Sequence, residues 1–267
     1  MRTKLVVGNW KMHKTLAEAV ATVESSLRYI AARQDIDVAI CPPFTALTKV
    51  REVLRHTHIQ VGAQDVFWKE SGAFTGQISP AMISELGCSF CIVGHSETRG
   101  RFGKVEVSEC SLPYFAENDH TVNLKIRALM FHSINPILCV GETEAEREAG
   151  HTDEIIRKQL TGALEGIDPA EMYFFCVAYE PVWAIGTGKT CDAAEANRVC
   201  GFIRKVIAEL ADADVSDNVR VLYGGSIKPD NASELFAQPE IDGGLVGGAS
   251  LEADSFSRIV MSAAALA

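Results

Sequence analysis

The segment FCIVGHSE, residues 90–97, joins the pattern of a buried strand to a group of reactive side chains. Residues 90–93 are all apolar, and a glycine, a histidine, a serine and an acid follow at once. A run that is apolar throughout, rather than at every second position, is typical of a parallel strand covered on both faces. The segment therefore predicts a buried parallel strand with polar side chains at its carboxyl end.

Seven further apolar runs repeat this pattern, and helical patterns separate them. Eight strand–helix units predict an α/β fold, a single (β/α)8 barrel in one domain that spans residues 1–267. A doubly wound open sheet is the main alternative, but its glycine-rich turn is not evident. The apolar runs are Leu5–Val7, Val38–Cys41, Ile59–Ala63, Phe90–Val93, Pro136–Val140, Tyr173–Ala178, Val221–Tyr223 and Leu245–Val246; the clearest helical patterns are Leu16–Ala31, Phe44–Arg55, Thr121–Ser133, Thr152–Leu164 and Ala193–Leu210.

Polar residues and glycines follow five of the predicted strands. In a barrel of this kind the chemistry lies on the loops after the strands, at one face of the molecule. We therefore expect these residues to meet at one site. They are N-W-K at 9–11, G-H-S-E at 94–97, Y-E-P at 179–181, Y-G-G-S at 223–226 and G-G at 247–248.

Composition restricts the partners and the location. The net charge is −10 and there is no long basic run, which argues against nucleic acid or an anionic membrane but leaves room for a small anion. No stretch approaches the roughly 20 apolar residues of a membrane span, and the amino-terminal apolar run is too short for a signal peptide. We expect a cytoplasmic protein.

The cysteines and histidines do not form a recognisable metal motif. Of eight scattered cysteines, Cys88 and Cys91 are close, but the second pair or nearby histidines that zinc or redox chemistry needs are missing. His56 and His58 likewise lack partners. We interpret the cysteines as structural, and free cysteines in this number suggest a reducing compartment. No metal site is predicted.

The glycines after the last two strands favour a phosphate site. Backbone N–H groups can approach an anion where no Cβ intervenes, and barrels often bind phosphate between these loops. The alternative is that Gly224, Gly225, Gly247 and Gly248 only form tight turns.

Residues 183–190, WAIGTGKT, end like a phosphate-binding P-loop, but Trp183 stands where that motif needs its first glycine. A mobile lid is the better interpretation. Pro181 and Trp183 would stiffen one hinge, and Gly186 and Gly188 would supply conformational freedom.

Three ionisable residues are candidates for catalysis. Glu180, at the base of the lid, would become a stronger base when the lid excludes water, unless it is only a helix-terminal acid or an ion-pair partner. His95 is either an acid–base group or a satisfied polar group. Lys11 is a fixed positive charge, a Schiff-base former or a surface lysine. The acids at 142–148 are interpreted as a solvated first helical turn.

Eight motifs occur in order along the chain, and together they resemble the triosephosphate isomerase family. The match runs from residue 4 to about 260, and the lid segment is highly specific. The motifs are N-W-K-M (9–12), G-A-Q-D (62–65), G-A-F-T-G (72–76), G-H-S-E (94–97), C-V-G-E (139–142), Y-E-P-V-W-A-I-G-T-G-K (179–189), Y-G-G-S (223–226) and L-V-G-G-A-S-L (245–251).

The resemblance implies a homodimeric TIM barrel that interconverts dihydroxyacetone phosphate and D-glyceraldehyde 3-phosphate in glycolysis and gluconeogenesis, without metal or organic cofactor. The family is a standard case of pKa tuning, and the roles are carried over from it. Glu180 then matches the base, and His95 the neutral imidazole that polarises the carbonyl. Lys11 matches the fixed positive charge, with Asn9 beside it and Glu97 in support. Phosphate-holding positions are Gly186, Ser226, Gly247 and Gly248, and dimer contacts come from Gly72, Ala73, Phe74, Thr75 and Gly76.

Residues 100–116, after strand 4, do not match the family and are interpreted as an insertion. Thr98 stands where the family usually has an arginine, and the next helix start is displaced to Glu117-Asn118-Asp119; Asp65 and Gln77 are smaller departures. The insertion is too apolar for a solvated tether. We expect it to pack on its own barrel or across the dimer near residues 72–76. Its apolar residues are Phe102, Val105, Val107, Leu112, Tyr114 and Phe115.

Two other functions remain open on the sequence. One is a Schiff-base aldolase that uses Lys11, against which the intact lid and Glu180 argue. The other is a non-catalytic barrel whose insertion serves as an interaction surface.

Overall fold

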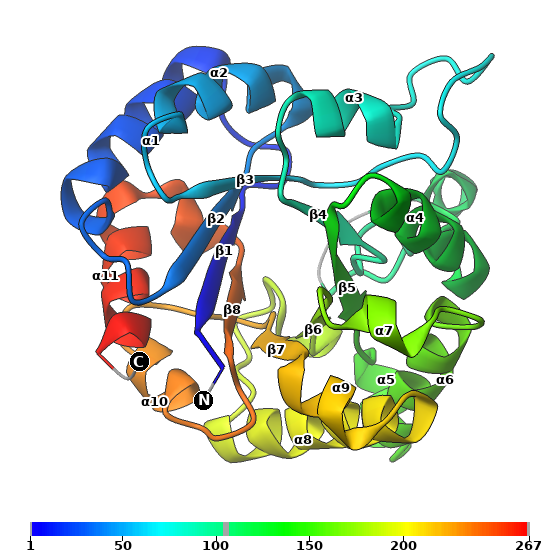
Figure 1. Ribbon diagram of the computed structural model, residues 1–267. Coiled ribbons are helices and arrows are strands. Elements are labelled where there is room, and N and C mark those ends of the chain that lie inside the picture. Colours follow the sequence, from blue (N-terminus) through cyan, green and yellow to red (C-terminus); the bar gives the residue numbers. More distant parts are fainter. Residues whose placement is uncertain (1, 104–106, 266–267) are drawn as a thin grey trace.

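The computed structural model describes residues 2–103 and 107–265, and its eight parallel strands form a closed barrel (Figure 1). Each strand pairs with the next in the sequence, and β8 closes the barrel by pairing with β1. The predicted (β/α)8 fold is confirmed. The strands are β1 (Leu5–Asn9), β2 (Asp37–Cys41), β3 (Gln60–Ala63), β4 (Phe90–Val93), β5 (Asn135–Val140), β6 (Cys176–Tyr179), β7 (Arg220–Tyr223) and β8 (Gly243–Val246).

Helices surround the barrel on its outside (Figure 1). The five helical patterns predicted from the sequence agree with α1, α2, α4, α6 and α8 to within two residues at each end. The α-helices are α1 (Leu16–Ile30), α2 (Phe44–Leu54), α3 (Pro80–Glu85), α4 (Asp119–Phe131), α5 (Glu144–Glu148), α6 (Thr152–Ala163), α7 (Pro169–Met172), α8 (Ala193–Leu210), α9 (Ala213–Asn218), α10 (Ala232–Phe236) and α11 (Ala253–Ala264); the 3-10 helices are η1 (Glu109–Phe115), η2 (Val182–Ala184) and η3 (Gly248–Leu251).

Both faces of the strands are covered, which explains their continuous apolar sequence. In β1, Leu5 and Val7 belong to the core inside the barrel, whereas Val6 belongs to the larger core between strands and helices. Side chains alternate between the two faces of a strand, so both sets of positions must be apolar. The strands therefore form a rigid frame that holds the loops at their carboxyl ends.

The predicted strand boundaries agree with the structure to within two residues, except for the start of β6, which is misplaced by three. The sequence suggested a strand over residues 173–178, but β6 begins at Cys176. Asp168 caps α7 by accepting a hydrogen bond from the Ala170 N–H at 2.9 Å, and Tyr173 and Phe174 follow α7 at the surface. Aromatic residues at a surface turn have the same composition as a strand start, and the sequence pattern did not separate them.

The insertion is anchored at its beginning and exposed at its end. Arg101 donates to the Gly141 carbonyl oxygen at 3.0 Å and forms an ion pair with Glu146. Phe102 and Phe115 are half-buried and meet edge to face, with ring centres 5.2 Å apart. Tyr114, by contrast, is 87% exposed. The expected packing of the insertion on its own barrel is therefore found at its beginning but not at Tyr114. Val105 lies outside the described residues.

The chain rejoins the family pattern at α4. Asn118 caps this helix by accepting from the Thr121 N–H at 3.1 Å, which agrees with the predicted helix start. Thr98 donates its hydroxyl to the Glu117 carboxylate, and Glu117 in turn pairs with Lys125 at 2.5 Å. Lys125 also pairs with Asp65 at 2.6 Å. Asp65 and Thr98, two positions that depart from the family pattern, thus belong to one cluster of hydrogen bonds and ion pairs within the chain.

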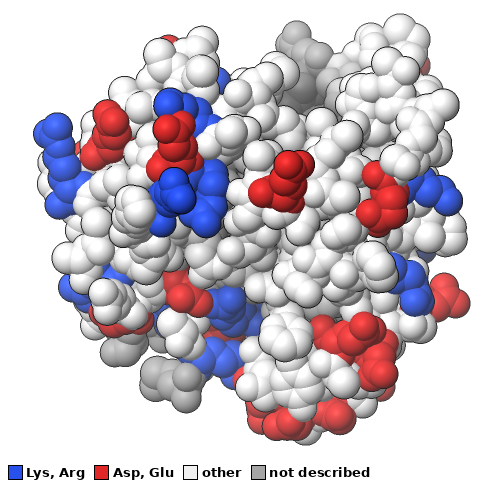
Figure 2. Space-filling model, turned by 45° about the horizontal axis from the view of Figure 1, so that its top comes forward, with Lys and Arg blue, Asp and Glu red and all other residues white. Residues whose placement is uncertain are grey.

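The distribution of charged side chains on the surface agrees with the net negative charge of the sequence. On the face in Figure 2, acidic side chains gather at the lower right and basic ones form small groups, so no extended basic surface covers it. All eight cysteines are free, and only Cys110 among them is exposed. Within the described residues, no helix has the length and apolar character that crossing a membrane requires.

Candidate active site

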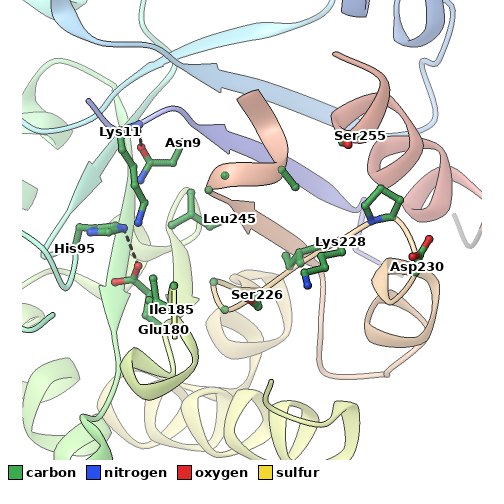
Figure 3. A pocket seen from close by; sticks show the side chains of 18 of the residues that line it. Asn9, Lys11, His95, Glu180, Ile185, Ser226, Lys228, Asp230, Leu245 and Ser255 are labelled. Carbon is green, nitrogen blue, oxygen red and sulfur yellow. Dashed lines mark hydrogen bonds and ion pairs between the residues drawn. The ribbon is translucent and has the colours of Figure 1, made fainter. Parts of the chain in front are cut away.

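A cavity of about 680 Å³ lies at the carboxyl ends of the strands and brings together residues far apart in sequence (Figure 3). Loops after β1, β4, β6, β7 and β8 contribute to its lining. Eight of the nine predicted site residues line it, and the ninth, Glu97, forms an ion pair with Lys11. The eight are Asn9, Lys11, His95, Glu180, Gly186, Ser226, Gly247 and Gly248.

Lys11 is held in a defined position beyond β1. Its backbone has φ of 51°, a left-handed conformation that is uncommon for a residue with a side chain. Two side-chain amides fix this turn: Asn9 accepts from the Lys11 N–H at 3.0 Å, and Gln64 donates to the Lys11 carbonyl at 2.8 Å. The Lys11 ammonium pairs with Glu97 at 2.6 Å. The site therefore holds a positive charge at a fixed place.

His95 is oriented through both ring nitrogens. The Glu97 N–H points at Nδ1 at a distance of 3.1 Å, so Nδ1 acts as an acceptor and carries no proton. In a neutral ring the proton then resides on Nε2, which lies 2.9 Å from Glu180 Oε1. The ring is thus prepared to donate one hydrogen bond into the cavity.

Glu180 is almost completely buried, with only 2% of its surface exposed. Besides His95, it contacts the Ser96 N–H, which donates to Oε2 at 2.9 Å. Burial acts to raise the pKa of Glu180, but His95 and the Ser96 N–H together outweigh it and hold the pKa below its ordinary value. The sequence predicted a raised proton affinity for Glu180 once the lid closes; in the structure without substrate the pKa is lowered.

Glycines form the other half of the cavity. A Cβ atom at Gly248 or Gly186 would meet no neighbour within 4 Å, so both backbones are open to the cavity. Gly247 lies against Lys11, because a Cβ there would be 3.4 Å from Lys11 Cε. Lys11 therefore lies between the glycine-lined half and the half with His95 and Glu180. Ser226 adds a hydroxyl to the glycine-lined half.

The beginning of the lid segment is held in place by Glu142, a residue that was not predicted from the sequence. Glu142 is fully buried and accepts hydrogen bonds from Trp183 Nε1 at 2.8 Å and from Tyr179 OH at 3.1 Å. Burial raises the pKa of Glu142, although these hydrogen bonds oppose the shift. The interpretation of Glu142 as part of a solvated turn is therefore wrong; the rest of that stretch forms α5.

The second half of the lid is exposed and carries its flexible residues. Gly186 and Gly188 have φ of 69° and 83°, values that disfavour any residue with a side chain. Ile185 lines the cavity while Gly186 and Gly188 are exposed. The segment thus joins a fixed hinge to a tip with the conformational freedom that a moving lid requires.

No group of three or more His, Cys, Asp or Glu side chains suited to a metal ion occurs within residues 2–103 and 107–265. At the end of the cavity near β4 and β6 the converging groups are the His95 imidazole, the Glu180 carboxylate and the Lys11 ammonium, and open glycine backbone lines the rest. This set suits proton transfer next to an anionic group rather than metal coordination.

Comparison with known proteins agrees with this geometry. The family model described as triosephosphate isomerase matches residues 4–263. A triosephosphate isomerase from Roseiflexus sp. (strain RS-1) is 50% identical over 260 residues, which cover 97% of each chain. The enzyme of the same name from Dictyoglomus thermophilum is 44% identical over 262 residues, covering 98% of this chain and 100% of the relative.

Proposed function

Because the chain belongs to the triosephosphate isomerase family, and so interconverts dihydroxyacetone phosphate and D-glyceraldehyde 3-phosphate, we propose that Glu180, His95 and Lys11 carry out this reaction. The observation that supports the proposal is the 2.9 Å contact between His95 Nε2 and Glu180 Oε1 in the cavity that Lys11 also lines. The family assignment replaces both alternative functions considered from the sequence. An ammonium ion-paired with Glu97 also fits a fixed charge better than a nucleophile.

The reaction moves one proton between two neighbouring carbons. The Glu180 carboxylate removes a proton from the carbon beside the substrate carbonyl, and the electron pair of that C–H bond forms an enediolate. Glu180 then returns the proton to the adjacent carbon, while the hydroxyl proton of the first carbon passes to the oxygen of the second, so that carbonyl and hydroxyl exchange places. The Nε2–H of His95 and the ammonium of Lys11 stabilise the oxygen on which negative charge develops. Glu97 and Asn9 contribute by holding these two donors in place.

Substrate must displace the contact between His95 and Glu180. The single proton on His95 Nε2 faces Glu180 in the free protein, so a substrate carbonyl can accept it only when Glu180 moves away. That movement removes the contacts with His95 and the Ser96 N–H, which lower the pKa of Glu180, whereas burial, which raises it, persists. The carboxylate therefore becomes a stronger base when it reaches the substrate.

We assign the glycine-lined half of the cavity to the substrate phosphate. Gly186, Gly247 and Gly248 offer open backbone there, and Ser226 offers a hydroxyl. Binding of phosphate to Gly186 would draw the tip of the lid over the site. A closed lid excludes water and retains the enediolate, which would otherwise lose phosphate.

A coupled isomerase assay on the purified protein tests the proposal, with Glu180→Gln as the decisive variant. We expect kcat to fall by at least about 10²- to 10⁴-fold, because a positioned general base contributes that much. Glu234→Gln, an exposed glutamate on α10, is the matched control and should retain full activity. A folded Glu180→Gln protein with normal turnover would show that another group moves the proton.

We further propose that residues 1–267 act as one domain in a cytoplasmic homodimer. The loop of residues 69–77 is exposed throughout and projects beyond α3 (Figure 1). Beside it lies a groove of about 730 Å³, which is lined by aromatic residues such as Phe67, Trp68 and Phe115 and by the charged cluster around Lys125. The tip residues Gly72, Ala73, Phe74, Thr75 and Gly76 of one copy would enter the groove of the other. Light scattering that finds a monomer at micromolar concentration would contradict this.

A further inference from the structure

The cations that line the active-site cavity differ in whether an acid neutralises them. Lys11 pairs with Glu97 at 2.6 Å, and Arg258 pairs with Asp230 at 3.3 Å. Lys228, on the loop after β7, lines the same cavity, and among the described residues no carboxylate lies within ion-pair distance of its ammonium. Asp230 is close in sequence but already pairs with Arg258. Lys228 therefore brings an uncompensated positive charge to the cavity.

The backbone around Lys228 is fixed by one side chain. Asn231 accepts from the Lys228 N–H at 2.8 Å and donates to the Ser226 carbonyl at 3.0 Å, so it bridges both ends of the loop. Pro229 follows and restricts the backbone further. Figure 3 shows the ammonium nitrogen of Lys228 turned toward the side of the cavity where Ser226 lies. Its charge thus faces the glycine-lined half from a defined anchor point.

We propose that Lys228 is a second binding cation for the substrate phosphate, placed opposite Lys11 across the glycine-lined half of the cavity. The inference rests on the assignment of that half to phosphate. Backbone N–H groups and the Ser226 hydroxyl offer only partial charges to a dianion. Glu97 partly neutralises the charge of Lys11, and Glu180 adds a negative charge to the same cavity. An unpaired ammonium supplies the charge that these groups lack.

The charge of the whole protein strengthens the argument. With a net charge of −10, the protein repels a dianionic substrate at long range. A cation exposed at the cavity opening counteracts this repulsion during approach and then contacts the phosphate. Lys228 should therefore act on binding, and it should act less on the proton transfer, which takes place at the other end of the substrate.

The test compares Lys228→Gln and Lys228→Arg with Lys205→Gln, which removes an exposed lysine from α8 outside the cavity. We expect Lys228→Gln to raise both KM and the inhibition constant of inorganic phosphate about three- to tenfold, the size expected for a partly exposed charge pair. Turnover at saturation should stay within about twofold, and added NaCl should shrink the difference from the native protein. Lys228→Arg should restore most of the affinity, and Lys205→Gln should match the native protein.

Calorimetric binding of inorganic phosphate separates this inference from the proposed reaction, because it does not require turnover. If the native protein binds phosphate but lacks isomerase activity, the proposed reaction is wrong. The phosphate affinity of Lys228→Gln then still tests the role of Lys228. If Lys228→Gln binds phosphate and substrate as tightly as the native protein does, the inference is wrong. A fall in kcat at unchanged KM would also overturn it, since Lys228 would then act on the chemistry or the lid.

Discussion

At the scale of single residues, the proposed reaction requires the surroundings of Glu180 to change when substrate arrives. In the structure without substrate, Glu180 contacts His95 Nε2 and accepts a hydrogen bond from the Ser96 N–H, and both contacts favour its ionised form. Its identity as an acid at the base of a lid could be read from the sequence. The direction of its pKa shift could not, because it depends on partners 84 and 85 positions away that only the barrel brings together.

The lowered pKa of Glu180 predicts how stability depends on pH. A carboxyl whose pKa is depressed by folding contributes stability that is complete above its ordinary pKa of 4.5 and is lost as the pH falls through the folded value. The free energy of unfolding should therefore exceed that of Glu180→Gln by a constant amount above about pH 5.5, and the excess should shrink below about pH 4.5. Urea denaturation at fixed protein concentration measures this. An excess that grew on acidification would mean that the folded pKa is raised.

At the scale of elements, the loop after β4 and the lid after β6 touch each other. A Cβ atom at Gly103 would lie 2.5 Å from the Ile185 carbonyl oxygen and 2.6 Å from that of Val182. Both distances are shorter than real contacts, so the lid requires glycine at position 103 for space. Arg101 fixes this part of the loop to Gly141 and Glu146. The first residues of the insertion therefore lie directly against the first half of the lid segment.

The contact predicts that Gly103→Ala impairs the reaction without unfolding the barrel. The added methyl group must displace the first half of the lid, and misplacement of about 1 Å can cost about 10²-fold in rate. We expect kcat/KM to fall about ten- to hundredfold, with circular dichroism unchanged. Glu109→Ala, an exposed position of the same insertion, is the control and should behave as the native protein. Native kcat/KM in Gly103→Ala would show that the lid does not depend on this contact.

How far the structure could be predicted from the sequence is also best judged at the scale of elements. Long helices and buried strands were predictable because a period of 3.6 or an unbroken apolar run extends over many residues. The start of β6 was misplaced because Tyr173 and Phe174 are apolar but lie at the surface. The burial of Glu142 was missed because its hydrogen-bond donors, Tyr179 and Trp183, are 37 and 41 residues away. Local pattern carries no information about such partners.

At the scale of the whole molecule, the end of the insertion and the projecting loop lie at one groove. Tyr114, Phe115 and Ala116 line the groove together with Phe67 and Trp68. Leu112 and Tyr114 are exposed in the single chain, with 40% and 87% of their surface accessible. Large apolar side chains exposed beside a groove are typical of a surface that a partner covers. We therefore propose that the second half of the insertion lies in the interface of the proposed dimer.

This placement predicts that Tyr114→Asp and Leu112→Asp dissociate the dimer. Burying an unpaired carboxylate in an apolar contact is costly, whereas the same carboxylate is solvated in the monomer, so the folded chain itself should lose little stability. Sedimentation at micromolar concentration should detect monomers of both variants and a dimer of the native protein. Phe174→Asp, which changes an exposed aromatic residue on the loop between α7 and β6, is the matched control and should remain dimeric. If the native protein and both variants are dimers of equal stability, the insertion lies outside the interface; if the native protein is a monomer, the dimer itself is wrong.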